Sequence, residues 1–106
     1  MVRMIRVSVL YPNDPGSTFD MDYYLAKHIP LLKHRLGAAL KSVSVDQGVS
    51  GAQPGTEPAY RAICVMLLDS VEAFGHAFTP HAAEILADVP RYTSVAPTVQ
   101  ISEVKM

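Results

Sequence analysis

Residues 60–68 read Tyr-Arg-Ala-Ile-Cys-Val-Met-Leu-Leu and contain the longest apolar run of the chain, residues 62–68. Side chains on both faces of this stretch are apolar, which predicts a strand that is covered on both sides. A sheet with helices on only one face would leave part of this strand open, and a large open apolar face is typical of an interface. The stretch therefore predicts a sheet that a second copy of the chain covers, in a homodimer.

Three other segments alternate between apolar and polar side chains, as strands with one buried face do. They are residues 4–11, 41–49 and 98–104. The turn-forming sequence Pro-Asn-Asp-Pro-Gly at residues 12–16 ends the first of them, and residues 50–58 form a loop by composition. Together with residues 60–68, these segments predict a four-stranded sheet.

A first helix is predicted from about Asp20 to Leu36, because apolar residues recur there at three- and four-residue steps. The members of this stripe are Met21, Leu25, Ile29, Leu32 and Leu36. Asp20 lies at the positive end of the helix, and Gly37 ends it. Pro30 removes one backbone donor and crowds the preceding turn, so we expect a kink or two short helices there.

Residues 69–90 predict a second helical region in two parts. Asp69 and Glu72 resemble a capping box at the start of the first part. Thr79 followed by Pro80 resembles the N-cap and first position of the second part. The expected apolar sides are Val71, Phe74 and Phe78 in the first part and Ala82, Ile85, Leu86 and Val89 in the second.

The predicted order of elements is strand, helix, strand, strand, helix, strand. This is the split βαβ pattern of the ferredoxin-like α+β fold, a four-stranded antiparallel sheet with both helices on one face. The chain has 106 residues, and a chain of this length builds one hydrophobic core. We therefore expect a single domain over residues 1–106.

The composition argues against several classes of protein. The hydrophobic fraction of 49% supports a packed core, and 9 basic against 10 acidic residues leave no basic surface for a nucleic acid. The single cysteine, Cys64, excludes an intrachain disulfide and favours a reducing compartment. The first residues do not resemble a secretory signal, and the longest apolar run is too short for a membrane helix. We expect a soluble cytoplasmic protein without a membrane partner.

His28 is the leading candidate for chemistry, because it lies one helical turn after Tyr24 at the edge of the apolar stripe. A histidine in such a place can act as a general base or acid near neutral pH. The alternative is a helix histidine that satisfies a neighbouring carbonyl at the Pro30 kink. Tyr11 ends the first strand, and a sheet end flanked by two helices with Tyr11, Tyr24 and His28 would form an apolar pocket with a few polar groups. The same residues would also suit an ordinary core.

Residues 88–93 combine Asp88, a proline and Tyr92 in a segment that could form a pocket lid or cap a helix. His76 and His81 do not have the spacing of a zinc-binding pair, so no metal site is predicted. Cys64 has the apolar surroundings of an inert thiol. No glycine-rich loop precedes a helix, so no motif indicates a nicotinamide, flavin or nucleotide cofactor, and the cofactor is unknown.

Several of these stretches resemble one known family. Phe-Asp-Met-Asp-Tyr-Tyr at residues 19–24, followed by His-Ile-Pro-Leu at residues 28–31, is similar to the first-helix signature of the EthD family. Residues 88–93 and 97–103 match two further stretches of that family, and Leu-Tyr-Pro at residues 10–12 fits its first strand. The resemblance extends over nearly the whole chain and implies the dimeric α/β barrel fold.

The resemblance also implies a setting for function. The founding member of the EthD family is associated with bacterial degradation of ethyl tert-butyl ether alongside a cytochrome P450 system, and members are commonly labelled reductases. Related dimeric α/β barrels include cofactor-free monooxygenases, polyketide cyclases, lactone isomerases and haem-handling proteins, several of which use histidines and tyrosines for acid–base work. The positions that match the EthD pattern are His28, Tyr24 and Tyr11 as catalytic candidates and Asp22, Asp88 and Tyr92 as substrate-binding candidates.

Two functional hypotheses follow from these observations. The first is an enzyme of small-molecule catabolism, either an oxidoreductase as the family label implies or a cofactor-free acid–base enzyme, acting on a small apolar organic substrate. The second is a non-catalytic protein that binds a small molecule or assists a partner oxygenase. A third possibility is a stable dimer whose pocket is filled by its own side chains.

Overall fold

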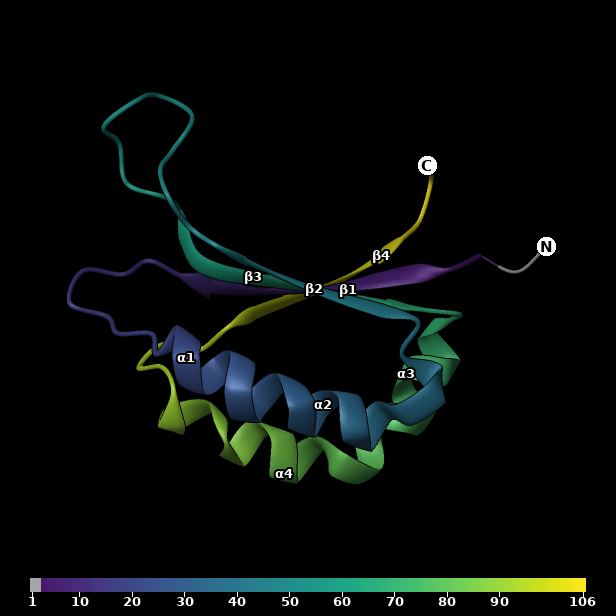
Figure 1. Ribbon diagram of the computed structural model, residues 1–106. Helices are drawn as coiled ribbons and strands as arrows, with labels where there is room; N and C mark the ends of the chain where they lie inside the picture. Colours follow the sequence, from purple (N-terminus) through teal and green to yellow (C-terminus); the bar gives the residue numbers. More distant parts are fainter. Residues whose placement is uncertain (1–2) are drawn as a thin grey trace.

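A computed structural model, which describes residues 3–106, confirms the ferredoxin-like α+β fold (Figure 1). The sheet contains four strands, all paired antiparallel, in the order β2-β3-β1-β4. The strands are β1 (Ile5–Pro12), β2 (Ser42–Gln47), β3 (Tyr60–Leu68) and β4 (Thr98–Glu103). All helices lie on one side of this sheet, as Figure 1 shows in an edge-on view.

Two helical regions form this second layer. The first region consists of α1 (Met21–Tyr23), a π turn η1 (Tyr24–His28), α2 (Ile29–Leu36) and a 3-10 turn η2 (Gly37–Ala39). The second consists of α3 (Val71–Phe78), a 3-10 turn η3 (Thr79–His81), α4 (Ala82–Ala87) and a 3-10 turn η4 (Val89–Arg91). No helix within residues 3–106 combines the length and the apolar composition that a membrane span requires.

The first helical region accommodates Pro30 by a wide turn and not by a break. Pro30 cannot donate to the carbonyl four residues earlier and would clash with it in a regular helix. The backbone instead forms the π turn η1, in which the amide of Ile29 donates to the carbonyl of Tyr24. A π turn holds an extra residue and changes which side chains face the sheet. Tyr24 and His28 are therefore buried, whereas Leu25, expected in the apolar stripe, is 50% exposed.

The ends of the helices differ in part from expectation. Asp20 caps α1 by accepting from the amide of Tyr23, and Gly37 ends α2 with a positive φ of 57°, as expected. The cap of α3 is Ser70 and not Asp69, because the Ser70 hydroxyl accepts from the amide of Ala73 at 3.0 Å. Position 70 has the extended backbone of an N-cap, which places its side chain, and not that of the preceding residue, over the first turn.

The second helical region is less buried than its pattern predicts. Thr79 does not cap α4, because residues 79–81 form η3 and continue directly into it. Leu86, expected on the buried side of α4, is 56% exposed, and Val71 of α3 is 51% exposed. Ile85 is the one fully buried residue of α4. This region therefore covers the sheet loosely.

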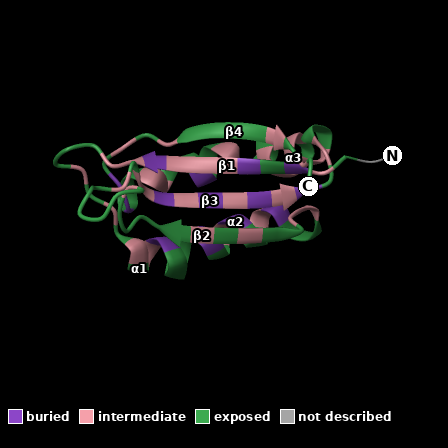
Figure 2. Ribbon diagram, turned by 90° about the horizontal axis from the view of Figure 1, so that it is seen from above, coloured by how far each residue is buried: buried purple, intermediate pink, exposed green. Residues whose placement is uncertain are grey.

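The core lies between the sheet and the first helical region. The strand register places Val7 opposite Met66 and Tyr11 opposite Ala62, and all four side chains are buried against the helices. Alternate residues of β3 are only half-buried, because they face away from the helices. Figure 2 shows this alternation along β1 and β3 at the centre of the sheet, with β2 and β4 more exposed at its edges. The β3 prediction is confirmed on its helix-facing side, and its other side is left open.

Candidate active site

Five of the six candidate side chains meet at one end of the space between the sheet and the helices. Tyr11 comes from β1, Tyr24 and His28 come from η1, Asp88 follows α4 and Tyr92 follows η4. The three tyrosines are 1–2% exposed and His28 is 4% exposed. The fold therefore assembles three distant parts of the sequence, namely β1, η1 and the segment around η4, into one buried polar cluster.

Hydrogen bonds connect this cluster. His28 Nδ1 lies 2.9 Å from Asp88 Oδ2, and the hydroxyls of Tyr92 and Tyr11 lie 2.7 Å apart. The Tyr92 hydroxyl is also 3.4 Å from His28 Nε2. An ionised carboxylate can only accept, so neutral His28 donates from Nδ1 and keeps an unprotonated Nε2. This is the tautomer that a general base at Nε2 requires.

Asp88 is held by more than the histidine. The Tyr23 hydroxyl donates to Asp88 Oδ1 at 2.7 Å, and Arg91 Nε lies 3.8 Å from the same oxygen. The Asp88 side chain is 14% exposed and the Arg91 side chain 72% exposed. The carboxylate therefore lies at the boundary between the buried cluster and solvent, with both of its oxygens in use.

The loop before α1 fixes the position of Tyr92. The amide of Asp20 donates to the carbonyl of Tyr92 at 2.7 Å, and Phe19 pairs with Thr93 in an isolated bridge. The Thr93 hydroxyl donates to the carbonyl of Thr18 at 2.8 Å. Because these bonds are made by backbone and buried groups, they hold the Tyr92 ring against the first helical region.

Ring packing orients the histidine. The imidazole of His28 stacks on Tyr24, with ring centres 5.3 Å apart and planes at 14°, and it lies 4.6 Å from the ring of Tyr92. Phe19 packs against Tyr11 at 5.1 Å and against Tyr24 at 5.0 Å in edge-to-face contacts. Aromatic pairs in these geometries are favourable, so the ring of His28 is held in a single orientation.

The site favours neutral histidine. Burial lowers the pKa of His28, although the hydrogen bond and the charge of Asp88 act in the opposite direction. Burial alone would raise the pKa of Asp88, but hydrogen bonds from Tyr23 and His28 outweigh it, and the pKa lies below its usual range. A neutral imidazole beside an ionised carboxylate is the combination expected of a general base at neutral pH.

The tyrosines remain protonated. Burial raises the pKa of Tyr11, Tyr24 and Tyr92 above the usual value. Burial also raises the pKa of the Cys64 thiol, which lies in the same region. The cluster therefore offers one base, His28, and several neutral hydroxyl donors.

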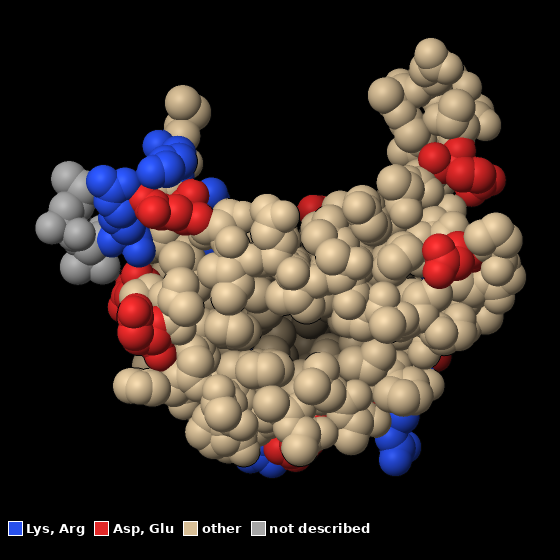
Figure 3. Space-filling view, turned by 180° about the vertical axis from the view of Figure 1, so that it is seen from behind, with Lys and Arg blue, Asp and Glu red and all other residues tan. Residues whose placement is uncertain are grey.

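An apolar cavity of about 290 Å³ leads from this cluster along the sheet. Tyr11, Tyr24 and His28 form its polar end together with Cys64. The remaining lining is apolar: Val7, Val9, Leu32, Met66, Phe74, Phe78, Ile85, Leu86, Pro97 and Val99. Figure 3 shows a hollow in the middle of the face opposite to that of Figure 1, bordered in this view by uncharged residues. The cavity suits an apolar molecule that carries one polar group.

The structure separates the remaining candidates. Asp22 lies exposed on α1 and does not join the hydrogen-bonded cluster. Tyr23, which no sequence pattern singles out, donates to Asp88; its neighbour Tyr24 is the tyrosine that lies one helical turn before His28. Phe74 and Phe78 stack on each other at 5.2 Å and line the cavity, half-buried. Within residues 3–106, no three His, Cys, Asp or Glu side chains are grouped as metal ligands.

Comparisons with known proteins give a consistent picture. Residues 17–96 match the family model of the EthD domain. An EthD-like protein from Ralstonia eutropha JMP134 has 43% identity and a TM-score of 0.94, over 100% of this chain and 96% of that chain. An EthD family protein from Bacillus halodurans C-125 has 21% identity and a TM-score of 0.72, over 96% and 99% of the two chains. A dimeric ferredoxin-like protein from Thermobifida fusca YX has 17% identity and a TM-score of 0.57, over 97% and 92%. No curated protein matches the sequence.

Proposed function

The chain belongs to the EthD domain family, and on that premise we propose that it is an enzyme of small-molecule metabolism that transfers protons by means of His28. The observation that carries the proposal is the hydrogen bond between His28 Nδ1 and Asp88, at 2.9 Å. The imidazole ring that makes this bond also lines an apolar cavity. The pairing fixes the tautomer and leaves Nε2 as the base. Asp88 also stabilises the imidazolium that forms when the base takes a proton.

The substrate class follows from the lining of the cavity. An apolar body would lie along the phenylalanines and the aliphatic residues, and a carbonyl or hydroxyl oxygen would lie at the Tyr11 and Tyr24 end. Removal of a proton next to a carbonyl places negative charge on that oxygen. Neutral hydroxyl donors in a site without bulk water stabilise such a charge. We propose a small apolar ketone, enol or phenol-like substrate and a proton transfer, isomerisation, cyclisation or dehydration as the reaction.

The reductase label of the family implies further chemistry. Hydride transfer requires a bound cofactor, whereas a paired histidine and neutral hydroxyl donors suffice for the proton transfer that we propose. Our proposal therefore takes the acid–base form of the enzyme hypothesis.

We further propose that the functional unit is a homodimer. Leu10 on β1 and Ile63, Val65 and Leu67 on β3 face away from the helices and are half-buried in the single chain. Figure 1 shows the connection between β2 and β3 and the C-terminal segment rising beside this face at opposite ends of the sheet. A partner laid on the sheet would bury these apolar residues. The dimeric ferredoxin-like protein from Thermobifida fusca shares the fold, which supports the proposal.

The test uses a probe whose reaction needs only a base. In 5-nitrobenzisoxazole, removal of the single C–H proton on the five-membered ring breaks the N–O bond and forms a nitrile and a coloured phenolate. We expect the protein to accelerate this reaction at neutral pH, and His28→Gln to lower the rate by about 10²–10⁴-fold. His34→Gln is the matched control, because His34 lies exposed on α2 in the same helical region.

Equal rates in the wild type and His28→Gln would contradict the proposal. Thermal stabilisation of both proteins by the probe, with equal rates near background, would assign the cavity to binding alone. Circular dichroism of the variants shows whether the fold is retained.

A further inference from the structure

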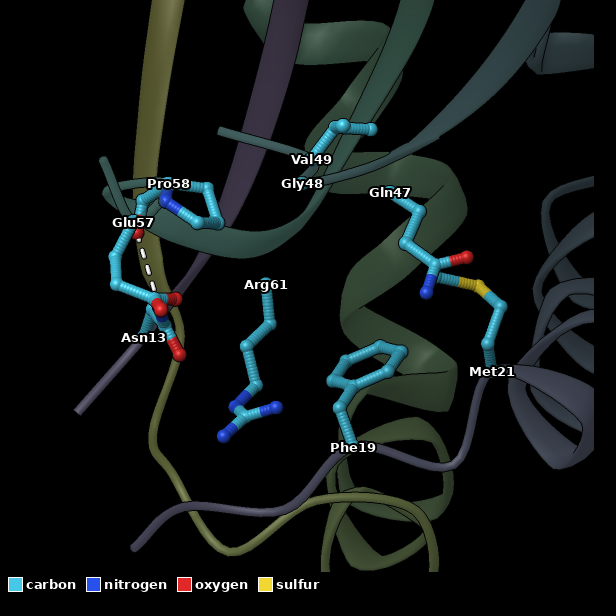
Figure 4. Close-up of a pocket in the computed structure, with 9 residues that line it drawn as sticks. All are labelled: Asn13, Phe19, Met21, Gln47, Gly48, Val49, Glu57, Pro58 and Arg61. Carbon is cyan, nitrogen blue, oxygen red and sulfur yellow. Dashed lines mark hydrogen bonds between the residues drawn. The ribbon is translucent and has the colours of Figure 1, made fainter. Parts of the chain in front are cut away.

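A second pocket, of about 230 Å³, lies at the end of the sheet where β2 and β3 are connected (Figure 4). It is formed by the segment between β1 and α1, the β2–β3 connection and Arg61 of β3. Its lining residues are Asn13, Phe19, Met21, Gln47, Gly48, Val49, Glu57, Pro58 and Arg61. None of them lines the cavity of the His28 site, so the two pockets are separate.

Arg61 is the positively charged group of this pocket, and its orientation is fixed. Its Nε donates to the Ser17 hydroxyl at 2.7 Å, and its Nη2 donates to the Ser17 carbonyl at 2.6 Å. Both bonds use one edge of the planar guanidinium. The second edge, which carries the N–H groups of Nη1 and the remaining one of Nη2, keeps its forked donor geometry. Figure 4 shows the side chain extending between Asn13 and Phe19.

Among the described residues, no carboxylate forms an ion pair with this guanidinium. The ion pairs within residues 3–106 involve Arg3, His28, Arg35, Lys41, Arg91 and Lys105, and not Arg61. Glu57 lines the same pocket but is exposed and lies beyond ion-pair distance from Arg61. A half-buried guanidinium that is anchored by neutral oxygens therefore keeps its charge available for a ligand.

The walls of the pocket are also fixed. The Asn13 amide group donates to the carbonyl of Pro58 at 3.0 Å, and the amide of Gly48 donates to the carbonyl of Arg61 at 2.8 Å. A Cβ at position 48 would lie 2.1 Å from the carbonyl oxygen of Tyr60, so this wall requires glycine. A ligand would thus meet a pocket that is already shaped, which reduces the entropy cost of binding.

We propose that this pocket binds the carboxylate of a small organic acid. The free edge of Arg61 matches the two oxygens of a carboxylate, which a guanidinium binds through two parallel hydrogen bonds. Phe19, Met21 and Pro58 provide an apolar wall for the body of the acid.

The site lies next to the proposed active site without sharing its cavity. The ring of Phe19 lines the Arg61 pocket and also packs against Tyr92 at 5.4 Å, in addition to Tyr11 and Tyr24. Phe19 thus lies between the Arg61 pocket and the tyrosines of the His28 cluster. An acid bound at Arg61 would contact Phe19, which in turn packs on those tyrosines.

The test compares benzoate with benzamide, its neutral isostere, by two-dimensional ¹H–¹⁵N NMR of the intact protein. We expect benzoate to give saturable shifts at the Arg61 Nε–H signal and at the amides of Gly48 and Val49, and benzamide to give none there. Arg61→Gln is expected to weaken benzoate binding by about tenfold or more, since it removes a charged hydrogen-bond donor. Arg61→Lys keeps the charge but loses the forked pair of donors. Its affinity for benzoate should therefore lie between those of the wild type and Arg61→Gln.

A second variant keeps the proposal testable if Arg61→Gln fails to fold. Ser17→Ala removes the acceptor of Nε but leaves Arg61 in place, and we expect a smaller loss of benzoate affinity. The effect should decrease at high salt, as expected for a charge contact. His28→Gln should keep the benzoate shifts, so a failure of the proposed acid–base function leaves this test unaffected.

Three results would overturn the proposal. Equal shifts with benzamide would show that the carboxylate is not recognised, and unchanged affinity in Arg61→Gln would place the binding elsewhere. Dissociation of a dimer by Arg61→Gln, with no benzoate response in the wild type, would assign Arg61 to a carboxylate of a second copy.

Discussion

The two helical regions that cover the sheet accommodate a proline in different ways. Each contains a proline near its middle, Pro30 in the first and Pro80 in the second, and the second also contains Pro90 in η4. In the first region the backbone widens into the π turn η1, and both Tyr24 and His28 become buried. In the second region the backbone tightens into the 3-10 turn η3, which buries none of its residues.

Because of this difference, the two helical regions form two different walls of the cavity. The first region contributes buried groups, the hydrogen-bonded His28 and the apolar Leu32, which are 4% exposed. Apart from the buried Ile85, the second contributes half-buried or exposed apolar groups, among them Phe78 and Leu86. Residues with few buried contacts open at lower free-energy cost than core residues. The first wall therefore holds the base His28 in place, and the apolar side chains of α3 and α4 can adapt to the shape of the ligand. Asp88 follows α4, but its hydrogen bonds to Tyr23 and His28 attach it to the first wall.

The largest effect is expected for Asp88→Asn, which removes the carboxylate that sets the tautomer on the first wall. An amide can present its NH₂ group to Nδ1, which would place the proton of His28 on Nε2 and block the base. We expect the rate with 5-nitrobenzisoxazole to fall by about 10²-fold or more, close to the loss in His28→Gln. Asp22→Asn is the matched control, since Asp22 is exposed on α1. A rate unchanged by Asp88→Asn would show that the pairing with Asp88 does not govern the base.

The second prediction compares the two walls by stability. Leu32→Ala truncates a buried side chain and should lower the free energy of unfolding by about 2–5 kcal/mol. Leu86→Ala truncates an exposed one and should change it by about 0.5 kcal/mol or less. Urea unfolding at one fixed protein concentration measures both. Similar losses in the two variants would show that the second region is packed as tightly as the first.

The sequence predicts the fold because its patterns are local. Alternation defines the strands, and the both-sided apolar pattern of residues 60–68 identifies the central strand β3. The π turn is not visible in the same way: Pro30 indicates a disturbance, but the choice between a kink, a break and a wide turn depends on what the sheet can bury. The periodicity predicts Leu25 in the core for this reason, because a regular helix would bury it, and this prediction is wrong.

The site is predictable only in part. His28, Tyr24 and Tyr11 have a spacing that brings them together once the helix lies on the sheet. The roles of Asp88 and Tyr23 depend on a contact between residues 65 positions apart, which no periodic pattern encodes. An ionised carboxylate at the edge of a buried cluster needs donors, so the presence of Asp88 implies a partner without naming Tyr23. Asp22, which shares a helix with Tyr23, lies on the solvent side.

The third prediction concerns the replacement of Pro30 and of Pro80 by alanine. Pro30→Ala restores an amide donor and allows η1 to relax towards a regular helix, which would turn Tyr24 and His28 relative to Tyr92. We expect the rate with 5-nitrobenzisoxazole to fall by about tenfold, because small displacements of a base are costly, while stability is kept. Pro80→Ala in the second region should leave the rate within about twofold, since no residue of η3 lines the cavity of the His28 site. Equal rates in Pro30→Ala and the wild type would show that the π turn does not position the histidine.

The smallest effect concerns the pH dependence of stability. The pKa of His28 in the folded protein lies below its ordinary value of 6.5. Between these two values the unfolded chain binds more protons than the native protein, so the free energy of unfolding falls as the pH is lowered from about 7. The slope contributed by one histidine is at most about 1.4 kcal/mol per pH unit. Asp88, whose pKa is also lowered, adds a loss of stability only in a more acidic range, below its ordinary value of 3.8.

Urea unfolding of the wild type and His28→Gln between pH 7 and pH 2 would separate the two contributions. We expect the variant to lose the part of the slope that begins near pH 6.5 and to keep the acidic part, because Asp88 remains bonded to Tyr23. The base form of His28 should also persist below pH 6.5, so the rate with 5-nitrobenzisoxazole should decline only at lower pH. A slope that is the same in both proteins would mean that the first wall tolerates a charged imidazole, and the division between a fixed and an adaptable wall would then rest on packing alone.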